Sequence, residues 1–270
     1  MIRTLKYISL FIAAVCILFP PYIVIVAAFK TPTEFALSAG YALPGSFFNF
    51  DNFANVLQKG KFLRSYFNIS YIIILSLAGN ILLGTMVAYA LGRFQFKLKS
   101  LILGAYAGAL VIPGITTQVA TFGIIKNLGL FNTHYSMVLL SLGADVVQIY
   151  IYLQFIKNIP YELDESAYLE GASLFRIYRS IIFPLLTPAT ATILILRTIS
   201  IYNDLYSPYL YMPSQSLGVV TTELMRFSNS YGSSWTMQSA AIILVAIPMV
   251  IFYLVLQKYI FSGVVNGAVK

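Results

Sequence analysis

The sequence has little charge and almost none of the residue types that form metal sites or disulfides. Charged residues make up 10% of the 270 positions and hydrophobic residues 59%, whereas charge is about 25% of a typical soluble domain. The single cysteine, Cys16, excludes a disulfide within the chain and a cysteine-based metal site, and His134 is also the only histidine. We therefore predict an integral membrane protein without a metal centre.

A phosphate-binding loop is also missing, because the pattern GxxxxGK followed by Ser or Thr does not occur. Any energy from ATP would therefore have to come from another chain. Asp145 and Asp204 are isolated in the sequence, which disfavours an enzyme with paired acids for a metal-diphosphate site. The net charge of +8 could indicate nucleic acid. However, the basic residues are spread between apolar runs, as topology signals are, so we expect membrane lipid and no nucleic acid as a partner.

Six apolar runs are long enough to cross a bilayer, which takes about 20 residues. The first is longer than the core of a signal peptide, and Pro20 and Pro21 should kink it rather than end it. Pro113 and Gly114 interrupt the third run, and residues 51–58 between the first two should form a short amphipathic helix. The expected spans are residues 7–29, 66–92, 101–125, 135–156, 185–206 and 237–260.

The distribution of Lys and Arg between these runs predicts the orientation of the chain. Six spans place both termini on one side, and that side holds ten basic residues against six on the other. The tight loop with Arg93, Lys97 and Lys99 carries most weight, because short loops follow the rule best. We therefore expect both termini, and the connection between the fourth and fifth spans, to lie in the cytoplasm.

That connection, residues 160–184, contains the only cluster of acids in the chain: Glu162, Asp164, Glu165 and Glu170. Acids at the start of a helix interact favourably with its dipole. Asn158 and Pro160 suit the start of one helix, and Gly171 suits the left-handed residue at its end. Ser173 can cap a second helix over residues 174–183, and Pro184 marks the return to the membrane. Spacing alone leaves an ordinary solvated loop as an equal alternative.

The spacing resembles a family motif. Glu165, Ser166 and Ala167, then three residues, Gly171, nine residues and the stretch 181–184 (IIFP) match the EAA motif of ABC-importer permeases, EAA-x3-G-x9-I-x-L-P. Ser166 and Phe183 depart from the motif but keep size or apolarity. The stretches 31–34, 63–68, 201–212 and the tail 266–270 are similar to the maltose-type carbohydrate permeases, so the resemblance covers essentially the whole chain.

The resemblance implies an all-α, MetI-like fold with six spans and a two-helix coupling hairpin between spans four and five. Residues 1–65 would hold the first span and an extracytoplasmic segment, 66–260 the permease core and 261–270 a cytoplasmic tail. Residues 267–270 of the tail would also approach the ATPases. The residues expected to couple to an ATPase are Glu162, Glu165, Ser166, Ala167, Tyr168, Glu170 and Gly171.

The resemblance also implies partners. These are a second permease subunit, two cytoplasmic ATPases that use ATP and Mg, and an extracellular or lipid-anchored binding protein that delivers a carbohydrate. The chain itself would bind no cofactor, have no catalytic residue and lie in the bacterial cell membrane with several spans. A permease for a non-sugar solute is the nearest alternative; an integral membrane enzyme and a channel or secondary transporter are weaker ones.

Polar residues within the predicted spans are candidates for the substrate pathway, because such residues usually face a protein interior or a water-filled cavity. Asp145 and Arg197 could instead pair with each other between neighbouring helices, which we regard as the more favoured interpretation of these two. The candidate pathway residues are Gln118, Asp145, Gln148, Tyr202, Asn203 and Asp204.

Overall fold

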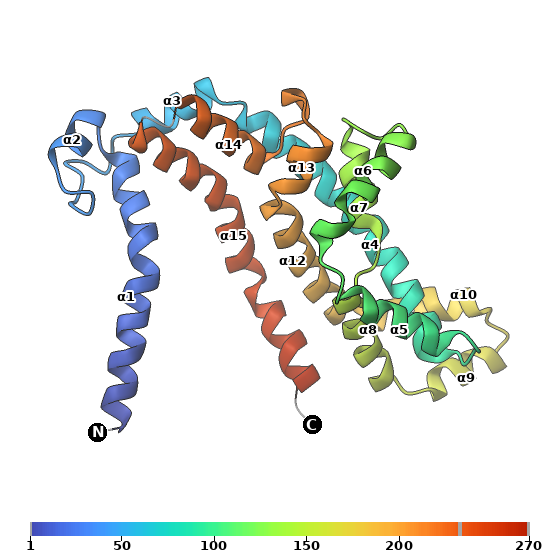
Figure 1. Ribbon diagram of the computed structural model, residues 1–270. Coiled ribbons are helices and arrows are strands. Elements are labelled where there is room, and N and C mark those ends of the chain that lie inside the picture. Colours follow the sequence, from blue (N-terminus) through green and yellow to red (C-terminus); the bar gives the residue numbers. More distant parts are fainter. Residues whose placement is uncertain (1, 232–233, 269–270) are drawn as a thin grey trace. The chain divides into compact units, whose positions relative to one another are not determined.

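The computed structural model describes residues 2–231 and 234–268, with side chains at 4–231 and 234–257, and every regular element in these ranges is a helix (Figure 1). Among these residues, three helices are long and apolar enough to cross a membrane: Thr4–Phe29, Phe62–Arg93 and Trp235–Gln257. The count rises to six when each of three bent helix pairs is taken as one span, in agreement with the number of spans predicted.

The chain divides into two compact units, and the first comprises Met1–Tyr66 and Val219–Ile251. Pro20 and Pro21 lie inside α1 and do not end it, as predicted, and α3 confirms the short helix expected at 51–58. The helices that contribute to this unit are α1 (Ile2–Phe29), α2 (Pro32–Leu37), α3 (Asp51–Lys59), the start of α4 (Phe62–Arg93), α14 (Val220–Tyr231) and the first part of α15 (Trp235–Ala268).

A buried lysine organises the connection after α1. Lys30 is fully buried, and its Nζ donates to Ser38 Oγ at 2.9 Å and to the carbonyl of Ala39 at 3.0 Å. The side-chain amide of Asn52 on α3 donates to the carbonyls of Ala28 and Lys30, both at 2.8 Å. The two bonds from Asn52 satisfy carbonyls at the end of α1 and just beyond it, where helical partners are missing.

The second unit comprises Phe67–Gly218 and Phe252–Lys270. Besides the rest of α4 and α15, its elements are α5 (Lys99–Ala109), η1 (Gly114–Thr117), α6 (Gln118–Asn127), α7 (His134–Leu142), α8 (Val146–Asn158), α9 (Glu162–Leu169), α10 (Leu174–Ile177), the π-helix η2 (Tyr178–Ile182), α11 (Phe183–Leu185), α12 (Thr187–Asn203), α13 (Tyr206–Tyr211) and η3 (Gln215–Leu217).

The core of this unit joins α4, α8, η2 and α12, with Ala88, Tyr152, Ile182 and Ala189 among its buried members. Small residues at every fourth position of α4, namely Gly84, Ala88 and Gly92, let α8 approach closely. A Cβ at Gly84 would collide with the side-chain amide of Gln148, and one at Gly92 would lie 2.7 Å from Cγ2 of Ile156. Small residues serve the same purpose where helices pack within membranes.

Two of the predicted spans, the third and the fourth, are bent rather than straight, and a further bend precedes the fifth. The third bends by 100° between α5 and the η1–α6 segment, at the Pro113–Gly114 interruption that was expected. The fourth bends by 44° between α7 and α8, so the span predicted over residues 135–156 is present but contains a break that was not predicted. The α10–α11 segment meets α12 at 71°. The backbone polar groups that these breaks free need partners, which determines where polar side chains gather.

Candidate functional site

The α9–α10 hairpin, residues 162–177, turns at a glycine in the left-handed conformation. Gly171 has φ +83°, which residues with a Cβ rarely adopt. Its N–H donates to the carbonyl of Tyr168 at 3.0 Å, and the N–H of Ala172 donates to the carbonyl of Ala167 at 3.0 Å. This pattern closes the end of α9. The bend predicted at Gly171 is confirmed.

The helix boundaries differ from the prediction in two places. Asn158 is the last residue of α8 and does not cap α9, which Tyr161 precedes without a side-chain cap. The helix predicted over residues 174–183 is capped as expected, since Ser173 Oγ accepts from the N–H of Arg176 at 3.3 Å. However, the α-helical geometry ends at Ile177, and the chain continues directly into the π-helix η2. Such widened turns are rare and recur at functional sites.

A buried ion pair fixes the hairpin to the end of α4. Arg93 Nε lies 2.7 Å from Asp164 Oδ2, and the two side chains are 8% and 11% exposed. Arg93 Nη2 also donates to the carbonyl of Ile159 at 3.0 Å, and its guanidinium lies 5.4 Å from the ring centre of Tyr161. Burial raises the pKa of Asp164 above its ordinary value, and the neighbouring guanidinium opposes this only in part. Nothing in the sequence beyond the two charges themselves indicates this contact.

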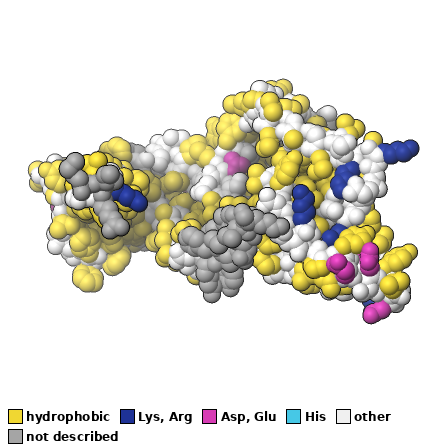
Figure 2. All heavy atoms as spheres, turned by 90° about the horizontal axis from the view of Figure 1, so that it is seen from below, with side chains coloured by type: hydrophobic (Ala, Val, Ile, Leu, Met, Phe, Trp, Pro, Cys, Tyr) yellow, Lys and Arg dark blue, Asp and Glu magenta, His cyan; other side chains and the backbone are white. Residues whose placement is uncertain are grey.

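The other acids of the hairpin point into solvent. Ala167 is half-buried and packs against the core of the second unit. Figure 2 shows Asp and Glu side chains gathered at one end of the face viewed from below, among hydrophobic ones and near Lys and Arg. The remaining residues expected to couple are all exposed: Glu162, Glu165, Ser166, Tyr168, Glu170 and Gly171.

A recess of about 250 Å³ lies between the end of α4 and the hairpin. Apolar side chains, including Phe94 and Leu174, form part of its lining, and Glu165 and Tyr168 line it as well. An exposed carboxylate beside an apolar recess is a suitable contact for a long basic side chain, which has an apolar stem and a charged head.

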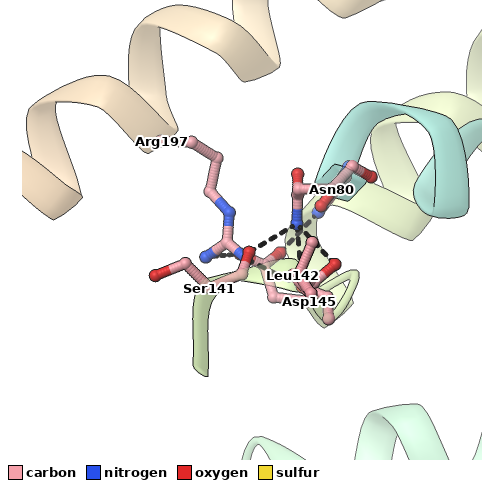
Figure 3. A network of polar contacts seen from close by, with 7 residues as sticks. Asn80, Ser141, Leu142, Asp145 and Arg197 are labelled. Atoms are coloured by element: carbon pink, nitrogen blue, oxygen red, sulfur yellow. Dashed lines mark hydrogen bonds and ion pairs between the residues drawn. The ribbon is translucent and has the colours of Figure 1, made fainter. Parts of the chain in front are cut away.

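A second polar group of residues surrounds the break between α7 and α8 (Figure 3). The side-chain amide of Asn80 on α4 donates to the carbonyls of Ser141 at 3.2 Å, Leu142 at 3.5 Å and Gly143 at 2.8 Å. One amide therefore satisfies carbonyls that the end of α7 leaves without helical partners. Sequence reasoning did not select Asn80, because a single Asn in an apolar run is not informative alone.

Asp145 and Arg197 complete this group. Asp145 Oδ1 accepts from the N–H of Gln148 at 2.7 Å and so caps α8, while Oδ2 lies 3.0 Å from Arg197 Nη1. Arg197 Nη2 donates to the carbonyl of Gly143 at 2.9 Å. Gln148 Nε2 donates to the carbonyl of Asn80 at 3.2 Å. The pairing of Asp145 with Arg197 is confirmed, and it belongs to a network that holds the break.

The other candidate pathway residues lie elsewhere along the second unit. Gln118 is half-buried at the start of α6, and Tyr202 is buried near the end of α12. Asn203 is exposed as the last residue of α12. Asp204 follows it, and its Oδ1 accepts from the N–H of Ser207 at 3.0 Å.

The comparison with protein families decides what kind of protein carries these features. Residues 3–266 match the family described as "Binding-protein-dependent transport system inner membrane component". The chain belongs to this family. It is a multi-pass permease subunit of an inner-membrane transport system and not an enzyme, as the sequence predicted.

Relatives of this permease extend over nearly its full length. It is 29% identical to the melibiose/raffinose/stachyose import permease protein MelC of Bacillus subtilis, over 99% of this chain and 98% of that protein. It is 30% identical to AmyC of Thermoanaerobacterium thermosulfurigenes, a probable permease for starch degradation products, over 98% and 97%. It is 31% identical to the multiple sugar-binding transport system permease MsmG of Streptococcus mutans, over 98% and 96%.

A solved structure supports the fold of this permease. A chain in the crystal structure of a bacterial ABC transporter involved in the import of the acidic polysaccharide alginate superposes with a TM-score of 0.85 at 20% identity. The alignment covers 96% of both chains. The all-helical importer-permease fold predicted from the sequence is therefore confirmed.

Proposed function

We propose that this permease carries a carbohydrate across the bacterial cell membrane as one subunit of an ATP-driven importer. The support for a sugar is the set of relatives at about full length whose names specify raffinose, starch products or multiple sugars. The chain contains no phosphate loop, so ATP and Mg are used by partner subunits. A binding protein delivers the carbohydrate.

The α9–α10 hairpin is the element through which we propose that the ATPases act. The observation that carries this assignment is the division of its acids: Asp164 is buried against Arg93, while Glu162, Glu165 and Glu170 are exposed. One face is thus attached to α4 and the other is free to dock on two cytoplasmic ATPase subunits. Glu165, beside the recess, makes the polar contact with a basic side chain, and Ser166, Ala167 and Tyr168 lie around it.

The mechanism follows from these attachments. Closure of the ATPases on ATP displaces the docked hairpin, and the Arg93–Asp164 pair transmits that displacement to α4. The free-energy difference between the inward-open and outward-open states then depends on contacts that are present in one state and absent in the other. Only such contacts can shift the equilibrium. Hydrolysis resets the hairpin, and the sugar has moved inward.

A second permease subunit completes the pathway in this proposal. Only 11% of the most apolar stretch of α1 and 17% of that of α15 is buried within this chain. Some of this surface faces lipid and the rest is available to a partner subunit. Both termini lie in the cytoplasm. The side chains of residues 267–270, for which an ATPase contact is expected, lie outside what the structure describes.

The test reverses the charge of Glu165. Glu165→Lys is expected to insert in the membrane normally but to lose ATPase association and most sugar uptake. Truncation of one partner of a buried charge contact costs about 2–5 kcal/mol, which is at least about a tenfold loss of affinity. The readouts are co-purification of the ATPases and cellular uptake of labelled raffinose and trehalose.

Asp51→Lys is the matched control, because Asp51 is an exposed acid in the first turn of a short helix outside the hairpin. It should leave both readouts unchanged. Normal ATPase association in Glu165→Lys would refute the coupling role of Glu165. Uptake of a peptide or amino acid but of no sugar would instead refute the carbohydrate assignment.

A further inference from the structure

Two charged side chains in the membrane-spanning part are partly exposed: Asp145, which caps α8 at the break, and Arg197 on α12. The side chain of Asp145 is 42% exposed and that of Arg197 20%. Both belong to helix pairs that count as spans. Exposure of such charges to lipid is costly, so they face a protein interior or a water-filled cavity. This part of α12 therefore does not lie against lipid.

The polar surface continues along α12 from the ion pair. Arg197, Ser200 and Asp204 follow the spacing that places side chains on one helix face. Ser200 is exposed, and Asp204, just beyond the helix end, is half-buried. A strip of this kind is what a hydrated path along the helix requires.

The ion pair is held in place from both sides. The Asp145 carboxylate is held by the N–H of Gln148, and the Arg197 guanidinium by the carbonyl of Gly143. Each carboxylate oxygen can accept more than one hydrogen bond. The pair can therefore bind a further group while the ion pair stays intact. Because its side chains are already ordered, binding costs little conformational entropy.

Unsatisfied acceptors lie in the same network. Asn80 and Gln148 are each 1% exposed, and Asn80 Oδ1 and Gln148 Oε1 have no hydrogen-bond partner among the described residues. Buried acceptors without a donor are costly. Both oxygens are buried, so a ligand would contact the partly exposed Asp145 and Arg197 instead: a hydroxyl can donate to the carboxylate and accept from the guanidinium.

We propose that Asp145 and Arg197, supported by Asn80 and Gln148, bind the hydroxyl groups of an uncharged saccharide on the wall of the translocation pathway. The inference rests on the proposed carbohydrate transport and adds the site and the charge class of the substrate. The pair has no net charge, so it matches a neutral ligand with donors and acceptors. An acidic saccharide would be repelled by Asp145 and would find Arg197 already paired.

The competing explanation is that the pair only holds the broken span together. The double variant Asp145→Asn with Arg197→Gln distinguishes the structural explanation from the binding site, because it removes both charges at once. A purely structural pair is then replaced without leaving an unpaired charge, and Asn preserves the cap of α8. A structural role predicts that the double variant recovers transport, whereas a hydroxyl site predicts that it does not.

The experiment uses the complete transporter, with its ATPases and binding protein, in proteoliposomes. Import of labelled raffinose, trehalose and maltotriose, and of trigalacturonate as the acidic probe, is measured together with ATP hydrolysis. We expect import of at least one neutral sugar and none of trigalacturonate. Asp145→Asn, Arg197→Gln and the double variant should each lower the sugar imported per ATP about tenfold, as for a lost charge-assisted hydrogen bond.

Asp51→Asn and Arg64→Gln are matched controls at exposed positions outside the network and should import normally. Arg197→Lys keeps the ion pair but loses the planar fork, so it should still reduce import per ATP even if the neutral variants fail to assemble. Wild-type import per ATP in either the double variant or Arg197→Lys would overturn the site. Import of trigalacturonate in place of the neutral sugars would overturn the charge class. Failure to import any saccharide would overturn the proposed function itself.

Discussion

Among single residues, Arg93 and Asp164 form the contact that links α4 to the hairpin most directly. Because both side chains are nearly buried, removal of either one leaves the other as an unpaired buried charge. Arg93→Leu and Asp164→Leu should each destabilise the start of the hairpin by about 3–5 kcal/mol. Hydrogen exchange of the α9 amides in nanodiscs measures this loss.

The double variant Arg93→Leu with Asp164→Leu should be less damaging than either single change, since no charge is then left without a partner. Its uptake should nevertheless fall if the pair transmits movement from the hairpin to α4. Equal exchange rates in the wild type and both single variants would show that the pair does not hold the hairpin.

Residues also show what sequence reasoning misses. Gly171 and Ser173 could be assigned because their roles are local: a left-handed bend and a helix cap. Asn80 and Arg93 could not, because their partners lie far along the chain. A local pattern records propensity and capping, whereas a contact between distant segments depends on packing that no single window of sequence contains.

Among elements, the hairpin depends on the backbone geometry of Gly171. With φ +83°, a β-branched residue there pays a left-handed strain of about 1–2 kcal/mol. Gly171→Val should therefore displace α10 relative to α9 and abolish most uptake, although no neighbouring atom lies within 4 Å of an added Cβ. The readouts are sugar uptake and co-purification of the ATPases.

Gly171→Asn is the matched control, because Asn tolerates the left-handed conformation better than other residues with a Cβ. It should retain most uptake. If Val and Asn behaved alike, backbone strain at the bend would not be the cause of the defect.

The spans were predicted to different degrees. The three continuous spans follow directly from length and hydropathy. The break in the fourth was missed because Gly143 and Asp145 interrupt an apolar run only briefly. What makes the break stable is the set of bonds from Asn80 and Arg197, which come from other helices.

For the whole molecule, the orientation in the membrane can be tested with the single cysteine. Cys16 is first replaced by Ala, and new cysteines are placed at Phe48 and Tyr168, which are 88% and 66% exposed. An impermeant maleimide should label Phe48→Cys in intact spheroplasts and Tyr168→Cys only after permeabilisation. The reverse labelling pattern would contradict the proposed topology, which the distribution of basic residues favours.

The π-helix η2 holds one residue more than an α-turn would. A π-turn and an α-turn each complete about one revolution, so the extra residue bulges outward and leaves the two flanking segments in phase. Loss of one residue from Tyr178–Ile182 would therefore leave a regular α-helix without rotating α10 relative to α11. The same loss in a regular α-helical stretch would rotate one flank by about 100°. The widened turn thus carries an additional residue without changing the angular relation between the hairpin and the segment that follows it.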